Sequence, residues 1–222
     1  MSGGWLRPAV FGAMDGLVTN VSLIAGVGGG GGSQHAILLT GLAGLAAGAF
    51  SMAAGEFVSV SSQNELVQAE VAKEKHELTH NAAAEQAELV GMLRSRGMSA
   101  ATARLAAAEI SAHPDKALAV HTSEELGVNP SELPSPYVAA GASLVSFAAG
   151  AIVPLLPYTV GANALWLALA LAALAAIVGG GLVARLTDRP FWRGALRQLV
   201  LGGLAAGLTY LIGLAVGGMA AG

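Results

Sequence analysis

Two pairs of glutamates, each spaced three residues apart, stand near the middle of the chain. Glu74 and Glu77 form the first pair, and Glu85 and Glu88 form the second. Residues three apart on a helix are neighbours, so each pair concentrates negative charge that a cation would relieve. Carboxylate oxygens are also common ligands for divalent cations. The spacing is consistent with a metal site or with a solvated acidic helix face.

The stretch HELTH, residues 76–80, overlaps the first pair. An H-E-x-x-H motif on a helix binds zinc in metalloproteases, where the glutamate activates a metal-bound water. Ala83 and Gln86 stand where the long form of the motif has glycine and histidine, and the motif lies in a polar segment rather than in a membrane span. We interpret Glu77 as a ligand of a transport domain and the two histidines as solvent-facing. A membrane-anchored zinc peptidase is the alternative function.

Two further alternatives involve a bound metal. Glu77 and His80 match the E-x-x-H motif of di-iron carboxylate bundles. An iron oxidase needs a second such motif, but Glu88 follows Glu85 at that spacing and Ala112 follows Glu109. A metal sensor or buffer, which binds a metal without moving it, is the other alternative.

The composition is that of a membrane protein. Of the 222 residues, 54% are hydrophobic and only 11% are charged, whereas soluble domains are about 25% charged. The mean hydropathy is +0.63. The chain has no cysteine, which excludes disulfides and thiolate metal sites, and its net charge of −3 argues against a nucleic-acid partner. We therefore expect an all-α protein embedded in a lipid membrane.

Five stretches are long and apolar enough to span a bilayer, which takes about 20 residues each. They cover residues 8–29, 36–60, 137–158, 162–185 and 194–220. The segment between the second and third spans carries eleven acidic and six basic residues, a net charge of −5 against +2 elsewhere. The sequence thus predicts membrane helices 1 and 2 in residues 1–64, an acidic helical metal-binding domain in 65–132, and membrane helices 3–5 in 133–222.

The lysines and arginines predict the orientation of these spans. Arg7 precedes the first span, six basic residues lie in the insert, and four arginines lie between the fourth and fifth spans. Five spans place all three regions on one side, and the positive-inside rule makes that side the cytoplasm. We expect the N-terminus and the insert in the cytoplasm, and the short, alanine- and glycine-rich chain favours a bacterial plasma membrane.

The insert contains signals for four helical segments. The first continues the second span to about residue 79, and the others are predicted from Asn81 to about Arg96, from Ser99 to about Ala112, and from Pro114 to just before Gly127. A break near Asn81 would let the two glutamate pairs face each other. A continuous helix would hold the pairs about 16 Å apart.

Two acidic residues lie within the predicted spans, Asp15 in the first and Glu56 in the second. Ionisable groups inside a membrane are costly and mark ion or proton paths. Met52 lies one turn from Glu56, and its thioether can ligate softer transition metals. Asp15 and Met52 come at similar depths from the cytoplasmic side. We therefore predict a transport path formed by Asp15, Met52 and Glu56.

These motifs resemble those of the vacuolar iron transporter family. The resemblance rests on MDGLVTNVSLIAGV in the first span, AGAFSMAAGEFVSVSSQ in the second, VSFAAGAIVPLLPY in the third and the four glutamates of the insert. Members of the family move Fe²⁺ or Mn²⁺ out of the cytosol in exchange for protons, so the resemblance implies a transporter and not an enzyme. It also implies a homodimer with the ion path between subunits, and no cofactor beyond the transported metal.

The resemblance also implies roles for individual residues. Asp15 and Met52 match the translocation residues of the family, Glu56 follows in the same motif, and Glu74, Glu77, Glu85 and Glu88 match its metal ligands. Two departures stand out.

Met14 replaces an asparagine before Asp15, and HTSEELGV, residues 121–128, replaces a methionine with two carboxylates. We predict His121 and Glu125 as the ligands of this last helix, with Thr122 and Glu124 as the open alternatives. A histidine ligand would shift the preference toward softer divalent ions.

Overall fold

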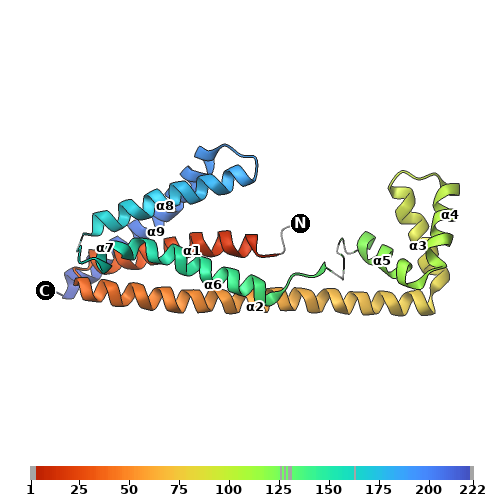
Figure 1. Ribbon diagram of the computed structural model, residues 1–222, viewed down its shortest axis with the longest axis horizontal. Helices are drawn as coiled ribbons and strands as arrows, with labels where there is room; N and C mark the ends of the chain where they lie inside the picture. The colour runs from red at the N-terminus through yellow and green to blue at the C-terminus, as the bar shows by residue number, and fades with distance from the viewer. Residues whose placement is uncertain (1–3, 126, 128, 130–131, 163, 221–222) are drawn as a thin grey trace. The chain divides into compact units, whose positions relative to one another are not determined.

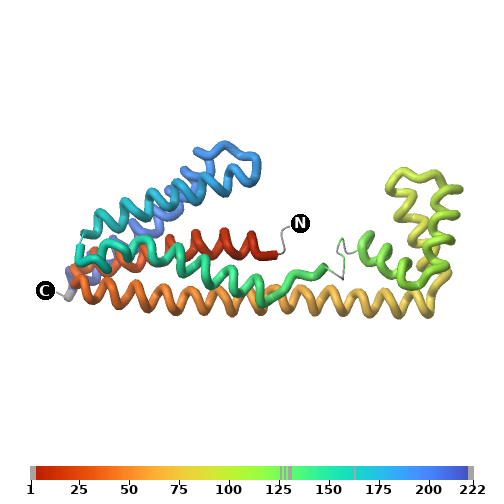
Figure 2. Tube along the Cα trace, viewed as in Figure 1, coloured from red at the N-terminus to blue at the C-terminus, as the bar shows by residue number. Residues whose placement is uncertain are grey.

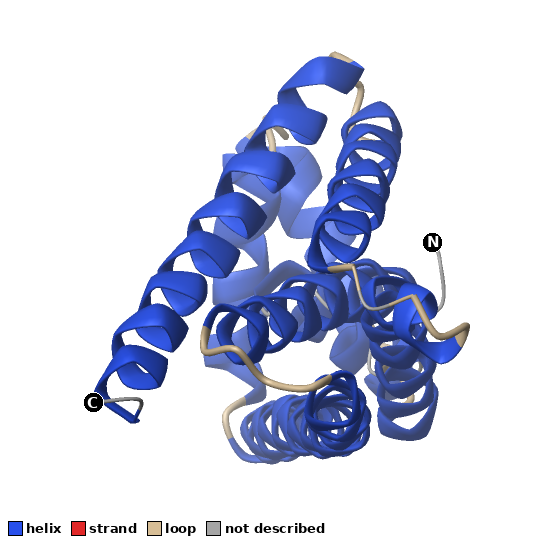
Figure 3. Cartoon of the chain, turned by 90° about the vertical axis from the view of Figure 1, so that its left-hand side faces the viewer, coloured by secondary structure: helices blue, strands red, loops and turns tan. Residues whose placement is uncertain are grey.

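A computed structural model describes residues 4–125, 127, 129, 132–162 and 164–220, and its regular elements are helices (Figure 1). In chain order they are α1 (Leu6–Gly29), α2 (Gln34–His80), α3 (Ala82–Ser95), α4 (Ala100–Ser111), α5 (Pro114–Glu125), α6 (Pro136–Ile152), the 3₁₀ helix η2 (Val153–Leu155), α7 (Leu156–Thr159), α8 (Leu165–Leu186) and α9 (Phe191–Ala220). The described residues contain no strand (Figure 3). The predicted all-α class is confirmed.

Within the described residues, five helical segments are long and apolar enough to cross a membrane, which agrees with the number of spans predicted from the sequence. They are Leu6–Gly29, Gln34–His80, Pro136–Thr159, Leu165–Leu186 and Phe191–Met219. The third span is built from α6, η2 and α7 in succession. Pro154 and Pro157 lie at this junction, where their missing N–H groups interrupt the regular α-helical hydrogen bonds.

The chain divides into two compact units. Residues 1–58 and 135–222 form the first, here called the membrane unit, and residues 59–134 form the second, here called the insert unit. Helix α2 contributes its apolar first part to the membrane unit and its polar last part to the insert unit.

Helix α1 lies at the centre of the membrane unit and packs against α6, α8 and α9. Leu17, Val21 and Ala25 of α1 form one buried cluster with alanines of α8 and α9. Ile24 of α1 belongs to a second buried cluster, which includes residues of α2, η2, α7 and α8. A third cluster joins α2 to α6 around Phe147. The core side chains are mostly small, which is typical of membrane helices that associate through close packing.

Glycines allow α1 and α6 to approach closely. A Cβ atom on Gly16 would collide with the backbone carbonyl of Phe147, and one on Gly150 would collide with the carbonyl of Ala13. Lipid tails are as apolar as leucine, so membrane helices are held together by such close van der Waals contact. The α1–α6 contact therefore depends on the absence of side chains at these two positions.

In the insert unit, the chain turns sharply between α2 and α3, as Figure 2 shows. Asn81 separates the two helices: its N–H donates to the carbonyl of Glu77 (2.7 Å), and its own carbonyl accepts from the N–H of Glu85 (3.1 Å). The side chain of Asn81, which from the sequence could cap α3, makes no capping hydrogen bond. Of the two arrangements that the sequence left open, the break is the one present.

The other helix boundaries of the insert unit follow local signals. Gly97 takes a left-handed φ of 94° just after α3, a conformation that favours glycine. The hydroxyl of Ser99 accepts a hydrogen bond from the N–H of Thr102 (3.2 Å) and so caps α4. Pro114 opens α5, where its missing N–H costs nothing. These boundaries agree with the sequence prediction, and they bring residues of α3 and α5 to the last part of α2.

Candidate metal site in the insert unit

Four side chains from three helices converge in the insert unit: Glu74 from α2, Glu85 from α3, and His121 and Glu125 from α5. Each offers one ligand atom, and the four atoms lie within 4.8 Å of one another. Nδ1 of His121 lies 2.9 Å from Oε1 of Glu74, 3.5 Å from Oε1 of Glu125 and 3.6 Å from Oε2 of Glu85. We call these four residues the insert cluster.

Two local features position the insert cluster. The break at Asn81 folds α3 back, so that Glu85 reaches Glu74 although the two are eleven positions apart in sequence. His121 and Glu125 are four residues apart on α5, and this spacing places them on one helix face. The helix break and the helical period thus combine to bring three carboxylates and one imidazole to a single point.

Most of the insert cluster is buried without the usual partners. Only 7% of Glu74, 5% of Glu85 and none of His121 is exposed to solvent. Beyond their contacts with one another, Oε1 of Glu74, Oε2 of Glu85 and both ring nitrogens of His121 have no hydrogen-bond partner in the described chain. Buried polar atoms are nearly always satisfied. Atoms left in this state are therefore available to a ligand.

The electrostatics of the insert cluster favour a bound cation. Burial, followed by the neighbouring charges of Glu125, Glu85 and Glu77, raises the pKa of Glu74 from 4.5 to about 7. Burial and the adjacent Glu88 also raise the pKa of the Glu85 carboxyl, while His121 acts in the opposite direction. Without a cation, these buried carboxylates hold protons more tightly than free carboxylates do. A divalent cation would supply the positive charge that the protons otherwise provide.

A cavity of about 180 Å³ adjoins the insert cluster. It is lined by Glu70, Lys73, Glu74, Glu77, Glu88, Thr122 and Glu125. Glu77 is half-buried and Glu88 is exposed. Both line the cavity but lie outside the four-residue group that shares a single point. The six predicted insert ligands therefore separate into four convergent residues and two residues at the cavity wall.

Sequence reasoning missed two residues of this cavity, Glu70 and Lys73. Both stand on α2, where Glu70 lies four residues before Glu74 and Lys73 lies four residues before Glu77. This spacing places each of them one turn away on the same helix face. Extending the face that carries Glu74 and Glu77 by one turn would have found them. The lysine places one positive charge beside the acidic side chains.

The structure separates the alternatives that the sequence left open on α5. Glu124 forms an ion pair with Arg96, with 2.8 Å between its Oε2 and Nη2 of the arginine. Thr122 is buried, but its hydroxyl donates to the carbonyl of Leu118 at 2.8 Å within the same helix. His121 and Glu125 are the α5 residues of the insert cluster.

The two histidines of HELTH lie outside the insert cluster. His76 and His80 are exposed, and their rings stack with centroids 4.0 Å apart. Nδ1 of His80 lies 2.8 Å from the carbonyl oxygen of His76. The intervening Glu77 lines the acidic cavity. Stacked rings do not present two nitrogens to a common tetrahedral ion, as an H-E-x-x-H zinc site requires.

The three predicted path residues lie in the membrane unit with different neighbours. Asp15 is half-buried on α1, and its Oδ1 accepts a hydrogen bond from the hydroxyl of Thr19 at 3.3 Å. Met52 packs against the third core cluster, which contains Phe147. Glu56 is half-buried one turn further along α2. Within the chain, Asp15 is therefore hydrogen-bonded to Thr19, whereas Met52 packs against the cluster around Phe147.

Comparison with known proteins assigns the chain to a family. A model described as the VIT family matches residues 6–214, which includes the five spans and the insert. This chain belongs to the VIT family. The family is one of transporters, so the chain is a transporter rather than the zinc peptidase or iron oxidase weighed from the sequence.

Curated relatives of this VIT-family chain cover most of its length. Vacuolar iron transporter homolog 1 of Oryza sativa subsp. japonica is 38% identical over 93% of this chain and 71% of the relative. Vacuolar iron transporter homolog 3 of Arabidopsis thaliana is 37% identical over 93% of this chain and 80% of the relative. The vacuolar iron transporter of Acanthamoeba castellanii is 37% identical over 81% of this chain and 63% of the relative. The chain is a multi-pass membrane transporter.

Proposed function

We propose that this VIT-family chain exports Fe²⁺, or a related divalent transition metal, from the cytosol in exchange for protons. The observation that supports this function best is the insert cluster, in which Glu74, Glu85, His121 and Glu125 converge and are mostly buried. It occurs in a chain whose relatives are named vacuolar iron transporters.

The ligand set favours a borderline divalent ion. Three carboxylates and one imidazole suit Fe²⁺, Mn²⁺, Co²⁺ or Zn²⁺ better than Ca²⁺, because a nitrogen ligand disfavours the hardest cations. Thiolate is excluded, since the chain has no cysteine. We take Fe²⁺ as the principal substrate and Mn²⁺ as the second.

In this proposal the insert gathers the ion before it enters the membrane. Glu77 and Glu88 at the cavity wall attract the cation, and the insert cluster then holds it. Binding displaces the proton that Glu74 carries around neutral pH, because burial and neighbouring carboxylates raise its pKa to about 7. The insert thus concentrates metal at the membrane surface without itself moving the ion across.

The membrane step is assigned to Asp15, Met52 and Glu56. A carboxylate in a span can bind a cation or a proton but not both, which couples the two fluxes. We propose that a homodimer forms the complete path, so that Asp15 and Met52 of two copies contribute to it.

The proposed orientation follows the basic residues. The N-terminus and the insert face the cytoplasm, because Arg7, the insert and the α8–α9 turn carry all the lysines and arginines. We propose the bacterial plasma membrane as the location, on the basis of the alanine- and glycine-rich composition.

Reconstituted flux tests this function. The purified full-length chain is placed in liposomes with an acidic interior, and Fe²⁺ entry is measured for wild type and for Asp15→Ala. We expect entry that requires the pH gradient in wild type and is lost in the variant, while Fe²⁺ binding to the insert remains in both. Wild-type protein that binds Fe²⁺ but shows no flux would instead identify a sensor or buffer.

A further inference from the structure

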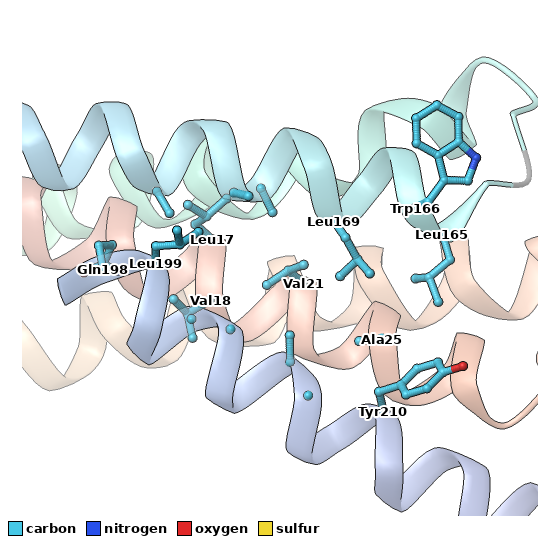
Figure 4. Close-up of a pocket in the computed structure, with 17 residues that line it drawn as sticks. Leu17, Val18, Val21, Ala25, Leu165, Trp166, Leu169, Gln198, Leu199 and Tyr210 are labelled. Atoms are coloured by element: carbon cyan, nitrogen blue, oxygen red, sulfur yellow. The ribbon is translucent and has the colours of Figure 1, made fainter. Parts of the chain in front are cut away.

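A second cavity lies in the membrane unit, and none of the residues assigned to metal transport lines it. It has a volume of about 500 Å³ and runs between α1, α8 and α9 (Figure 4). Its wall is apolar, with Leu17, Val21 and Leu169 on one side and the glycine-rich face of α9 on the other. Its volume lies within the range typical of small-molecule sites. We call this cavity the α9 groove.

Glycine contacts at the two ends of α9 account for the groove. Near its start, α9 touches α8, because a Cβ atom on Gly194 would collide with the carbonyl of Gly180. Near its end, α9 touches α1, where a Cβ on Gly213 would collide with the carbonyl of Gly26. The middle of α9 contacts neither helix so closely: a Cβ atom on Gly207 would meet no atom within 4 Å. The groove is the space left between these two contacts.

The length of the groove fits one leaflet of a bilayer. Along α9 the groove extends from Gln198 to Tyr210, which at 1.5 Å per residue is about 18 Å. The hydrocarbon core of one leaflet is about 15 Å thick, half of the whole core. Trp166 at the far end is 71% exposed, so the groove is open at that end. An extended acyl chain fits this length and this apolar wall.

The other end of the groove is marked by positive charge. Gln198 closes the groove where α9 crosses α8, and Arg197 directly precedes it. Arg185 lies in the last turn of α8, Arg189 follows Asp188 in the connection, and Arg193 lies in the first turn of α9; all four arginines are exposed. No carboxylate forms an ion pair with any of them within the described residues, and Arg193 lies over the ring of Trp192 at 5.4 Å. Exposed tryptophan and arginine are typical of the headgroup level of a membrane.

We propose that the α9 groove binds one anionic phospholipid, with an acyl chain along α9 and its phosphate held by Arg193 and Arg197. These arginines are four residues apart on one helix and can form charge-assisted hydrogen bonds to phosphate oxygens. The four arginines near the groove's polar end outnumber the single carboxylate of Asp188 and select an anionic headgroup over a zwitterionic one. The lipid would fill the space between α1, α8 and α9 and so hold α9 in place. This site is independent of the proposed metal function.

Lipid retention measured by native mass spectrometry tests the proposal. The full-length protein is incubated with phosphatidylglycerol or with phosphatidylcholine of the same acyl chains. We expect wild type to retain phosphatidylglycerol preferentially. Gly207→Leu should abolish this retention by filling the groove without a backbone clash. Gly218→Leu is the matched control, because Gly218 lies outside the groove on the same helix and a Cβ there also meets no atom within 4 Å.

The headgroup contact has its own test. The double variant Arg193→Gln with Arg197→Gln should bind phosphatidylglycerol about 30-fold more weakly, the factor expected from two arginines at an anionic surface. The control variant Arg104→Gln, at an exposed position of α4, should bind phosphatidylglycerol as wild type does. Equal retention of the two lipids by wild type, or full retention by Gly207→Leu, would overturn the proposal. A changed oligomeric state in Gly207→Leu with unchanged lipid would instead make the groove a contact between copies.

A fluorescence measurement keeps the proposal testable if Gly207→Leu does not fold. The chain has three tryptophans, and replacing Trp5 and Trp192 with phenylalanine leaves Trp166 at the groove as the reporter. Phosphatidylglycerol with brominated acyl chains should quench Trp166 more strongly than brominated phosphatidylcholine does. Equal quenching by the two lipids would contradict the proposed selectivity.

Discussion

Replacing Glu74 with glutamine measures how much the ionised carboxylate of Glu74 destabilises the metal-free insert unit. Glu74 is 7% exposed and carries a carboxyl whose pKa is raised to about 7 by burial and by three neighbouring glutamates. The ionised form is therefore less favourable in the folded insert than in the unfolded chain. Glutamine has nearly the same shape but no charge, so Glu74→Gln should stabilise the metal-free insert at a pH where Glu74 is ionised.

The magnitude and its pH dependence follow from the pKa. A rise from 4.5 to about 7 corresponds to about 3 kcal/mol, since each unit is worth about 1.4 kcal/mol. Because the folded pKa lies above the unfolded value, Glu74 lowers the free energy of unfolding progressively between pH 4.5 and 7. The variant should therefore gain up to about 3 kcal/mol over wild type at pH 8 and almost nothing near pH 4.5.

Hydrogen exchange of the full-length protein in detergent, read by mass spectrometry, measures this difference locally. With metal removed by a chelator at pH 8, amides of α3 and α5 should be protected up to roughly 100-fold more in Glu74→Gln, the factor equivalent to about 3 kcal/mol. With saturating Mn²⁺, wild type should be the more protected of the two proteins. Its Glu74 carboxylate helps to bind the ion, and an ion that binds only the folded state stabilises that state. The matched control is Glu109→Gln, at an exposed position of α4.

Lower protection in the metal-free variant at pH 8 would refute this reasoning. That result would mean that Glu74 is stabilised as a carboxylate by His121, whose Nδ1 lies 2.9 Å from its Oε1. The insert cluster would then be a structural ion pair rather than a site prepared for a cation.

Three further predictions concern separate parts of the protein. Asp15→Ala should abolish Fe²⁺ flux into liposomes but leave the metal affinity of the insert within twofold, as titration calorimetry would show; unchanged flux would exclude Asp15 from the path. His121→Ala should weaken metal binding by at least about tenfold, while Glu109→Gln should not, and equal affinities in the same titration would remove His121 from the site. Gly16→Ala should lower the thermal unfolding temperature, because the added Cβ collides with the backbone of α6, whereas Gly55→Ala, with no atom within 4 Å of the new Cβ, should leave the unfolding temperature unchanged or raise it slightly.

The sequence alone determined the features that depend on local patterns. The five spans follow from the length of apolar stretches, and the end of α3 at Gly97 and the starts at Ser99 and Pro114 follow from residues with strong local preferences. At Asn81 the sequence left a break and a continuous helix open. Each signal lies within a few residues of the feature it predicts. The spacing of the glutamates likewise indicates a candidate metal site, because residues three apart on a helix are neighbours.

Only the tertiary structure decided which of those residues meet. Five of the six predicted insert ligands are glutamates that the sequence does not distinguish, yet Glu74, Glu85 and Glu125 converge with His121 while Glu77 and Glu88 line the cavity beside them. The burial that raises the pKa of Glu74 arises where three helices cross, and no local pattern encodes a crossing.

The α9 groove is likewise a feature that only the packing of the helices decides. The sequence shows glycines all along α9, but the structure shows that Gly194 and Gly213 make contacts while Gly207 faces open space. Helical period fixes the face on which a residue lies, whereas its neighbour on that face depends on how the helices pack.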